Sequence, residues 1–351
     1  MAHRHGVFSH LLWMLWRCTP SSIRLAVYHY AARHGDASHG FRIRMLPYGL
    51  VLKTVSGSPH IEADNIRFVA ENTSVPVPRI LDVLDDPPEL DGGFILMTRV
   101  EGVSLGQWIS DHAIRAPGHL ELLQRMDVCI AKGDDAGFNV TIEKLKLMPP
   151  TTLDMSDAAP LVQDLRDAFV ELRSLPSPSS AVTGLRGRPL KCSRGGDITL
   201  IGPFRDQQEF KDFIFAQANS SIFAHRMPTL HCLAEPVNAR KHRICFTHAD
   251  LAPRNIVVKD GRLAGIIDWE FAGWYPEYWE RTSMEAQMMH EPVTHQFWDA
   301  VQLFAPERYD EEMTLEWMLW ACTGTTAVMS EAGDSPYCPR VRDSPYPVPK
   351  S

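Results

Sequence analysis

Residues 246–270 read FTHADLAPRNIVVKDGRLAGIIDWE, and this stretch decides how the chain folds. Asp260-Gly261 is a strong two-residue hairpin turn with apolar residues on both sides. Such a turn predicts three cross-strand pairs: Lys259 with Arg262, Val257 with Ala264, and Asn255 with Ile266. Asp268 then points to the same side of the sheet as Asn255, at about 7–8 Å between backbones. An amide oxygen and a carboxylate at that separation can share magnesium ions, so the hairpin predicts a metal site.

A third polar side chain, Asp250, lies five residues before Asn255 in a loop where Pro253 prevents a regular helix. Phosphoryl transfer from ATP needs magnesium to neutralise the phosphates, and a carboxylate to orient the attacking hydroxyl and accept its proton. One Asp for the hydroxyl, with an Asn and a second Asp for metal, is the minimal set. The alternative interpretation is that Asp250 and Asn255 cap a turn and Asp268 ends a strand.

The stretch resembles the H-x-D-x-x-x-x-N loop and following metal aspartate of the aminoglycoside phosphotransferase and choline kinase-like family. The run THADLAPRNIVV…GIIDWEFAGWYPEYWE is especially similar to fungal members, and the likeness extends over roughly residues 40–280. The resemblance implies a two-lobed, protein kinase-like α+β fold that uses ATP and Mg²⁺. It also implies that Asp250 is the catalytic base, that Asn255 and Asp268 bind magnesium, and that His248 organises the loop.

The nucleotide side of the site is expected around Lys53, which ends the apolar run Gly-Leu-Val-Leu. A buried lysine needs an anionic partner. Glu62 in the next helix is the natural candidate, and Glu71 is a weaker one; the alternative is a lysine that reaches solvent at a strand end. The family likeness implies that this lysine grips the α- and β-phosphates.

The run Ile95-Leu-Met-Thr-Arg-Val-Glu-Gly matches the family's hinge between the lobes. By that match the Thr98 carbonyl and the Val100 N–H should face the adenine, with Met97 behind them. One departure is the absence of a G-x-G-x-x-G loop between residues 30 and 53, where His34–Gly40 is the nearest candidate. This departure leaves open weak ATP binding, or none.

The order of elements predicts a small lobe followed by a mainly helical one. Alternating residues around Pro47-Tyr-Gly suggest a hairpin, Ile61–Asn72 a helix, the proline-containing run after it an extended connector, and Phe94–Thr98 a buried strand. We therefore divide the chain into five parts. They are a helical extension (1–35), a nucleotide-binding N-lobe (36–97), a hinge (98–102), a catalytic C-lobe (103–334) and a disordered tail (335–351).

The composition of the chain bears on three questions: whether it binds nucleic acid, whether it spans a membrane, and whether its cysteines are reduced. The net charge of −8 argues against a nucleic-acid binder, and no run reaches the length that a transmembrane helix needs. Seven scattered cysteines without a C-x-x-C pair favour reduced thiols in the cytoplasm.

The phosphate acceptor is expected to be a hydroxyl group of a small molecule, because no room follows Asp268 for the activation segment of a protein kinase. Arg254 is the only nearby cation in the loop; it either neutralises the transferring phosphate or braces the loop. A group of four residues follows Asp268 and has two possible roles. These residues either line an acceptor pocket or belong to the core and the start of a helix: Glu270, Trp274, Tyr275 and Glu277. The main rival interpretation is a non-catalytic kinase-like protein that binds a nucleotide or metabolite; no protein partner is indicated.

Overall fold

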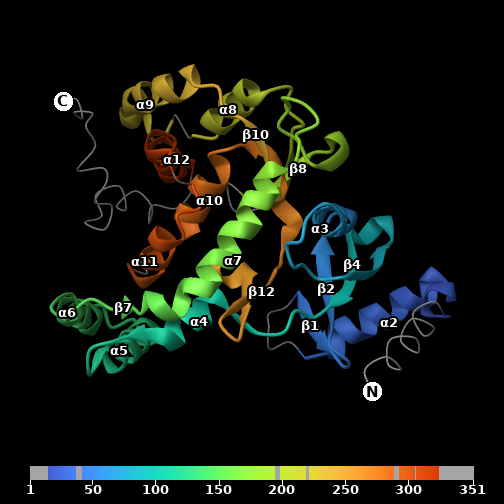
Figure 1. Ribbon diagram of the computed structural model, residues 1–351, viewed down its shortest axis with the longest axis horizontal. Coiled ribbons are helices and arrows are strands. Elements are labelled where there is room, and N and C mark those ends of the chain that lie inside the picture. Colours follow the sequence, from blue (N-terminus) through green and yellow to red (C-terminus); the bar gives the residue numbers. More distant parts are fainter. Residues whose placement is uncertain are drawn as a thin grey trace.

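The chain forms two unequal lobes, a small one built around a sheet and a larger, mainly helical one (Figure 1). The computed structural model describes residues 15–36, 42–193, 198–218, 221–287, 292–304 and 306–323. The expected two-lobed α+β architecture is confirmed. No helix among the described residues is long and apolar enough to cross a membrane.

The small lobe contains a four-stranded antiparallel sheet in the order β1-β2-β4-β3. Its strands are β1 (Ile43–Leu46), β2 (Leu50–Ser56), β3 (Ile80–Asp85) and β4 (Gly92–Thr98). The hairpin expected around Pro47-Tyr-Gly is β1–β2, and the expected buried strand is β4. The extended connector is more than a connector: once its prolines end at residue 78, the chain pairs with β4 as edge strand β3.

Helices cover both faces of this sheet. Helix α3 (His60–Asn72) packs its Ala63 against Val51, Val55, Ile95 and Met97. Helix α2 (Ser21–His34) packs its Tyr28 against the alternate residues Leu52, Phe94 and Leu96. Side chains alternate between the faces of a strand, so Lys53, between Leu52 and Thr54, lies on the α3 face.

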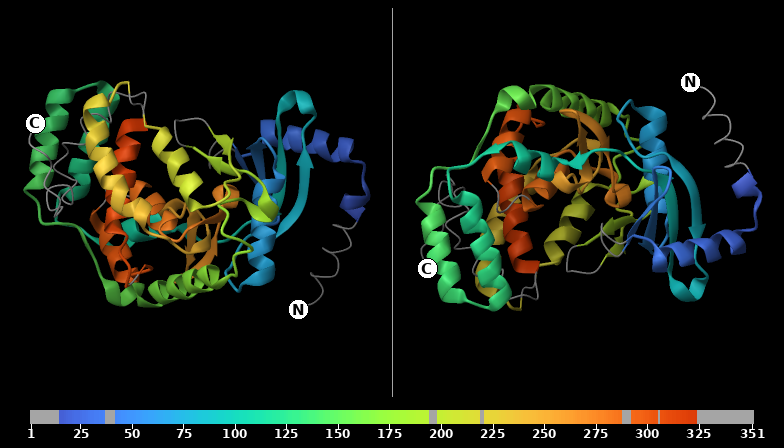
Figure 2. Two further views of the ribbon diagram at one scale, coloured as in Figure 1. Left: turned by 90° about the horizontal axis from the view of Figure 1, so that it is seen from above. Right: turned by 90° about the horizontal axis from the view of Figure 1, so that it is seen from below.

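One continuous apolar core holds the large lobe together. Figure 2 shows the helices and strands of this lobe from two sides. The longest helix in it, α7 (Met155–Ser174), buries five residues whose spacing in the sequence places them on one helix face: Leu161, Leu165, Ala168, Phe169 and Leu172. Its other helices are α4 (Leu105–His112), α5 (His119–Lys132), α6 (Asp135–Lys146), α8 (Gln207–Ala216), α9 (Met227–Ala239), α10 (Trp279–Gln287), α11 (Pro292–Val301) and α12 (Asp310–Thr323). Its strands are β5 (Val103–Ser104), β6 (Ala113–Ile114), β7 (Thr152–Leu153), β8 (Leu190–Cys192), β9 (Thr199–Ile201), β10 (Ile244–Thr247), β11 (Ile256–Lys259), β12 (Arg262–Ile266) and β13 (Gly273–Pro276).

Some sequence expectations fall on residues outside the described ranges. They are the tail 335–351, most of the Gly-containing stretch 34–40, the first 14 residues of the extension, and the part beyond Thr323 of the helix that the apolar run Leu315–Ala327 predicts. Pro20 predicts a break in the helical extension, and α2 begins directly after it.

Candidate active site

The hairpin that carries the predicted metal residues is β11–β12, and its turn is the one expected. Asp260 and Gly261 have φ angles of 52° and 70°, as a tight hairpin turn between twisted strands requires. Lys259 pairs with Arg262, but a β-bulge then shifts the register, so that Val257 faces Gly265 and Ile256 faces Ile266. The predicted pairs Val257–Ala264 and Asn255–Ile266 are therefore wrong by one residue. Instead, the backbone carbonyl of Asn255 accepts a hydrogen bond from the backbone N–H of Ile267 at 2.9 Å, and Ile267 directly precedes Asp268.

Asp250 is buried at the start of this hairpin and is held by two neighbours. One guanidinium nitrogen of Arg254 contacts its carboxylate oxygens at 2.8 and 2.9 Å. The side-chain amide of Asn255 donates to its Oδ2 and to its backbone carbonyl, both at 2.7 Å. Because the amide nitrogen of Asn255 is used in this way, its carbonyl oxygen Oδ1 is the atom suited to a metal ion.

His248 is buried and joins the loop to the strand that leads into Asp268. Its Nε2 lies 3.0 Å from the carbonyl of Ile267, and its Nδ1 lies 3.2 Å from the backbone nitrogen of Asp250. Burial lowers the pKa of His248 despite the neighbouring Asp250, so the ring is neutral at pH 7. A neutral ring that donates from Nε2 and accepts at Nδ1 satisfies both contacts.

Lys53 from the small lobe contacts Asp268 at the end of this hairpin and also contacts Glu62, its predicted partner. Its Nζ lies 2.7 Å from Glu62 and 2.5 Å from Asp268, whereas Glu71 is exposed on the same helix as Glu62. Burial alone would lower the pKa of Lys53, but the carboxylates of Glu62 and Asp268 outweigh it and raise that pKa. Burial raises the pKa of Glu62 to about 7. Lys53 offsets the burial of Asp268 and keeps the pKa of its carboxyl below the usual value.

The available donors suit a magnesium ion that arrives with a nucleotide. Within the described ranges no group of three or more His, Cys, Asp and Glu side chains converges to hold a metal. Asn255 and Asp268 offer an amide oxygen and a carboxylate, both hard oxygen donors. Mg²⁺ is typically bound by one or two such protein groups together with water and phosphate oxygens, so this donor set fits it.

The segment predicted to be the hinge, residues 98–102, begins with the last residue of β4 and leads to β5. The backbone N–H of Arg99 donates to the carbonyl of Gly49 at 2.7 Å, and the N–H of Thr98 donates to the carbonyl of Arg79 at 3.0 Å. Gly102 has a φ of +138°, and a Cβ atom there would stand 2.3 Å from the carbonyl oxygen of Val258. Only glycine fits there, and directly after it β5 pairs with β11.

Glu280 is a residue that the sequence patterns did not single out. It is buried on α10, and its carboxylate accepts the backbone N–H groups of His248 at 2.7 Å and Ala249 at 3.0 Å. Ala249 has a positive φ of 65°, so this carboxylate holds a strained turn of the loop. Burial raises the pKa of Glu280 to about 7, although the two N–H donors favour the charged form.

Of the four residues expected as possible walls of an acceptor pocket, two are core residues. Trp274 and Tyr275 are buried in β13, which pairs antiparallel with β10. That pairing places Glu277 beside Arg243, at the end of β10 away from His248. Glu270 is buried and pairs with Lys191 at 3.0 Å. Lys191 was missed because it lies in a stretch rich in Pro, Gly, Ser and Arg, residues 176–203, whose composition is typical of a loop or an irregular hairpin and marks no single residue as functional.

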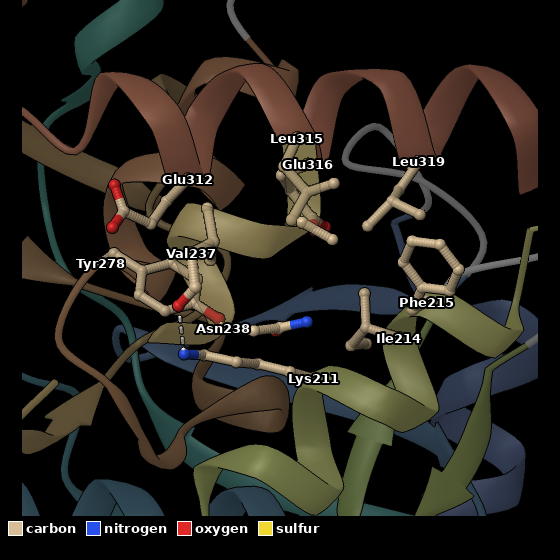
Figure 3. A pocket seen from close by; sticks show the side chains of 11 residues that line it. Lys211, Ile214, Phe215, Val237, Asn238, Tyr278, Glu312, Leu315, Glu316 and Leu319 are labelled. Carbon is tan, nitrogen blue, oxygen red and sulfur yellow. Dashed lines mark hydrogen bonds between the residues drawn. The ribbon is translucent and has the colours of Figure 1, made fainter. Parts of the chain in front are cut away.

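A pocket lies elsewhere in the large lobe, among helices α8, α9 and α12 (Figure 3). Lys211 on its wall donates to the carbonyl of Val237 at 2.7 Å, and burial lowers the pKa of this lysine. Glu312 on α12 lies 3.0 Å from His242, which precedes β10. The loop that carries Asp250 follows the other end of β10, so this pocket is separate from the Asp250 site.

Comparisons with known proteins identify a family for the sequence and a fold for the structure. The sequence model described as "Phosphotransferase enzyme family" matches residues 50–284. The crystal structure of aminoglycoside phosphotransferase APH(4)-Ia is 14% identical over 83% of this chain and 82% of that chain, with a TM-score of 0.51. A choline/ethanolamine kinase family protein from Mesorhizobium loti is 15% identical over 84% of this chain and 77% of that chain, with a TM-score of 0.40. No curated protein matches the chain.

Proposed function

The chain belongs to the phosphotransferase enzyme family, and within that family we propose that it moves the γ-phosphate of ATP to a hydroxyl group of a small molecule. The observation that carries the proposal is the meeting of Lys53 with Asp268 beside the loop of Asp250 and Asn255. A cation for phosphates, two oxygen donors for metal and a buried carboxylate are the parts that phosphoryl transfer requires.

In the proposed reaction Asp250 orients the acceptor hydroxyl and takes its proton as the hydroxyl oxygen bonds to the γ-phosphorus, while the bond from that phosphorus to the β–γ bridging oxygen breaks and ADP leaves. Asn255 and Asp268 would hold Mg²⁺, which when bound neutralises charge on the phosphates. Arg254 and Asn255 fix the Asp250 carboxylate from two sides. His248, neutral and buried, keeps the loop in register with the strand before Asp268.

The nucleotide is proposed to lie between the lobes. Lys53 would contact its α- and β-phosphates while Glu62 holds the lysine in place. The Thr98 carbonyl and the Val100 N–H would face the adenine. The division into an N-lobe of residues 36–97, a hinge of 98–102 and a C-lobe of 103–334 is part of this proposal, as is a location in the cytoplasm.

The acceptor is proposed only as a small hydroxylated molecule, with neither nucleic acid nor membrane as a partner. A solved ternary complex of a thermostable APH(4)-Ia mutant contains ADP and hygromycin B. One fold of this kind serves many acceptors, so that complex does not name the acceptor here. The rival, a kinase-like protein that binds a nucleotide or metabolite without turnover, draws on one observation: residues 30–53 contain no G-x-G-x-x-G run.

Thermal unfolding with ATP tests the proposal, with and without magnesium, on the wild type and on Asp268→Ala. We expect ATP to raise the melting temperature of the wild type more with magnesium than without, and this magnesium-dependent gain to vanish in the variant. The absence of any shift at millimolar ATP would overturn the nucleotide site. If binding is present, release of phosphate from ATP with a panel of hydroxylated acceptors separates the enzyme from the non-catalytic binder.

A further inference from the structure

The backbone at Asp268 is held in an unfavourable conformation. Asp268 has φ 67° and ψ 59°, the left-handed region, without being glycine. For such a residue this region is unfavourable and persists only where the surroundings impose it. The chain turns directly after Asp268 into a short 3-10 helix, Trp269–Phe271, so contacts that hold residues 269–272 also restrain the backbone at Asp268.

The first of these contacts comes from Asn65 in the small lobe. Its side-chain amide is buried and donates to the carbonyl of Trp269 at 2.8 Å and to that of Ala272 at 3.1 Å. Asn65 lies three residues after Glu62 on helix α3, which places both side chains on one helix face. One face of α3 therefore holds Lys53 through Glu62 and the chain after Asp268 through Asn65.

The second contact comes from Lys191 on strand β8. Its ammonium is buried and donates to Glu270 at 3.0 Å and to the backbone carbonyl of Ser56, at the end of β2, at 3.3 Å. Glu270 lies two residues after Asp268. The lysine thus connects the segment that follows Asp268 to the last residue of β2, the strand that carries Lys53.

We propose that Asn65 and Lys191 are positioning residues for Asp268, which clamp residues 269–272 across the two lobes and so aim the Asp268 carboxylate at Lys53 and at a bound magnesium ion. The inference rests on the proposed function. Neither residue touches the reacting atoms: each acts through residues 269–272. Groups that orient a metal ligand in this way typically contribute 10–100-fold to metal affinity.

Titration calorimetry with AMP-PNP, in excess magnesium and in EDTA, tests the clamp on Asn65→Leu and Lys191→Met. We expect both substitutions to weaken binding in magnesium by about tenfold or more, and binding in EDTA by less than about threefold. Unfolding without ligand is measured in parallel. Asn72→Leu is the matched control, since Asn72 is exposed on the same helix and donates only to Phe68 within that helix.

The possible results separate the clamp from the proposed function. Variants that lose stability but keep the full magnesium-dependent gain in affinity would show a purely structural role and overturn the inference. A wild type without any magnesium-dependent gain would overturn the proposed function, and the inference with it. If Asn65→Leu does not fold, Asn65→Ser replaces it, and if that also fails, the Lys191→Met result decides.

Discussion

Lys53 on strand β2 and Asp268 after strand β12 form an ion pair of 2.5 Å, although 215 residues separate them in the chain. The pair joins the two lobes at the point where the nucleotide phosphates are proposed to bind. Lys53 also neutralises Glu62, whose side chain is only 1% exposed. One ammonium group therefore supports both a buried carboxylate and the proposed metal ligand.

Replacing Lys53 by methionine is expected to destabilise the fold as well as the site. Glu62 would remain buried without its partner, and breaking a buried pair in this way costs about 3–5 kcal/mol. Urea unfolding of Lys53→Met measures the loss. The double variant Lys53→Met/Glu62→Gln removes the unpaired charge at Glu62, and the Asp268 side chain is 32% exposed, so water can solvate its carboxylate and most of the loss should be recovered. A double variant no more stable than the single one would contradict this account.

Asp250→Asn is expected to slow phosphate release from ATP by about 10²–10⁴-fold, because the amide cannot accept the proton of the attacking group. Its affinity for AMP-PNP with magnesium should stay within about threefold, since Asp250 is assigned to the acceptor and not to the nucleotide. Single-turnover release of phosphate and calorimetry measure the two quantities. If the rate of phosphate release and the affinity for AMP-PNP fall by the same factor, Asp250 contributes to nucleotide binding and is not the catalytic base.

Arg254 offers a test of charge against shape. Its side chain is largely exposed, so neither Arg254→Lys nor Arg254→Gln should change the free energy of unfolding by more than about 1 kcal/mol. One guanidinium nitrogen makes both contacts to Asp250, and a lysine can supply such a donor. We expect the lysine variant to keep its rate within about threefold and the glutamine variant to lose about tenfold. A glutamine variant at the wild-type rate would show that Asp250 needs no cation.

The stability of the wild type should fall with rising pH through the ionisation of Glu280. Its pKa rises from 4.5 to about 7 on folding, so in this window the folded state binds a proton that the unfolded chain releases. This group lowers the free energy of unfolding by up to about 3 kcal/mol across the window, and its effect levels off above it. The side chain in Glu280→Gln does not ionise, so its contribution to stability does not change with pH. The excess stability of the wild type over the variant should therefore shrink from about pH 5 to about pH 8. Urea unfolding at several pH values measures it, and parallel curves would contradict the assignment.

Helix α2 should contribute to stability without affecting nucleotide binding. Tyr28 is buried, and burial raises its pKa, so its hydroxyl stays protonated and donates to Asp82 at 2.6 Å. We expect Tyr28→Ala to cost about 3–5 kcal/mol and Tyr28→Phe about 1 kcal/mol in urea unfolding. The affinity for AMP-PNP should be unchanged, because Lys53 lies on the other face of the sheet. Tyr30→Ala, at an exposed position of the same helix, is the matched control, expected within about 0.5 kcal/mol.

The sequence predicted those parts of the site that depend on local pattern. Asp260-Gly261 predicted the hairpin. The number of residues between this turn and Asp268 predicted that the carboxylate lies near Asn255. A buried Lys53 called for an acid, and Glu62 in the next helix supplied it. These predictions succeed because turn chemistry and the cost of an unpaired buried charge act over a few residues or on one obvious partner.

The parts that were missed depend on contacts between distant segments. The bulge at Val257–Val258 leaves no mark in composition, so the register was wrong by one residue. Lys191 meets Glu270 only because the β8–β9 hairpin folds back on the small lobe. Glu280 finds its backbone donors only once α10 packs beneath the loop. Each of these contacts is set by tertiary packing, which a single sequence does not display.

The pairing of β5 with β11 has a consequence for the order in which the molecule assembles. Val103 and Ser104, directly after Gly102, are the outer strand against which Val257 and Val258 rest. Segments so distant in the chain meet late, because closing a long loop costs entropy that only the final contacts repay. During synthesis the small lobe also emerges long before the β11–β12 hairpin. We expect the pairing of β5 with this hairpin to form in one of the last steps of folding.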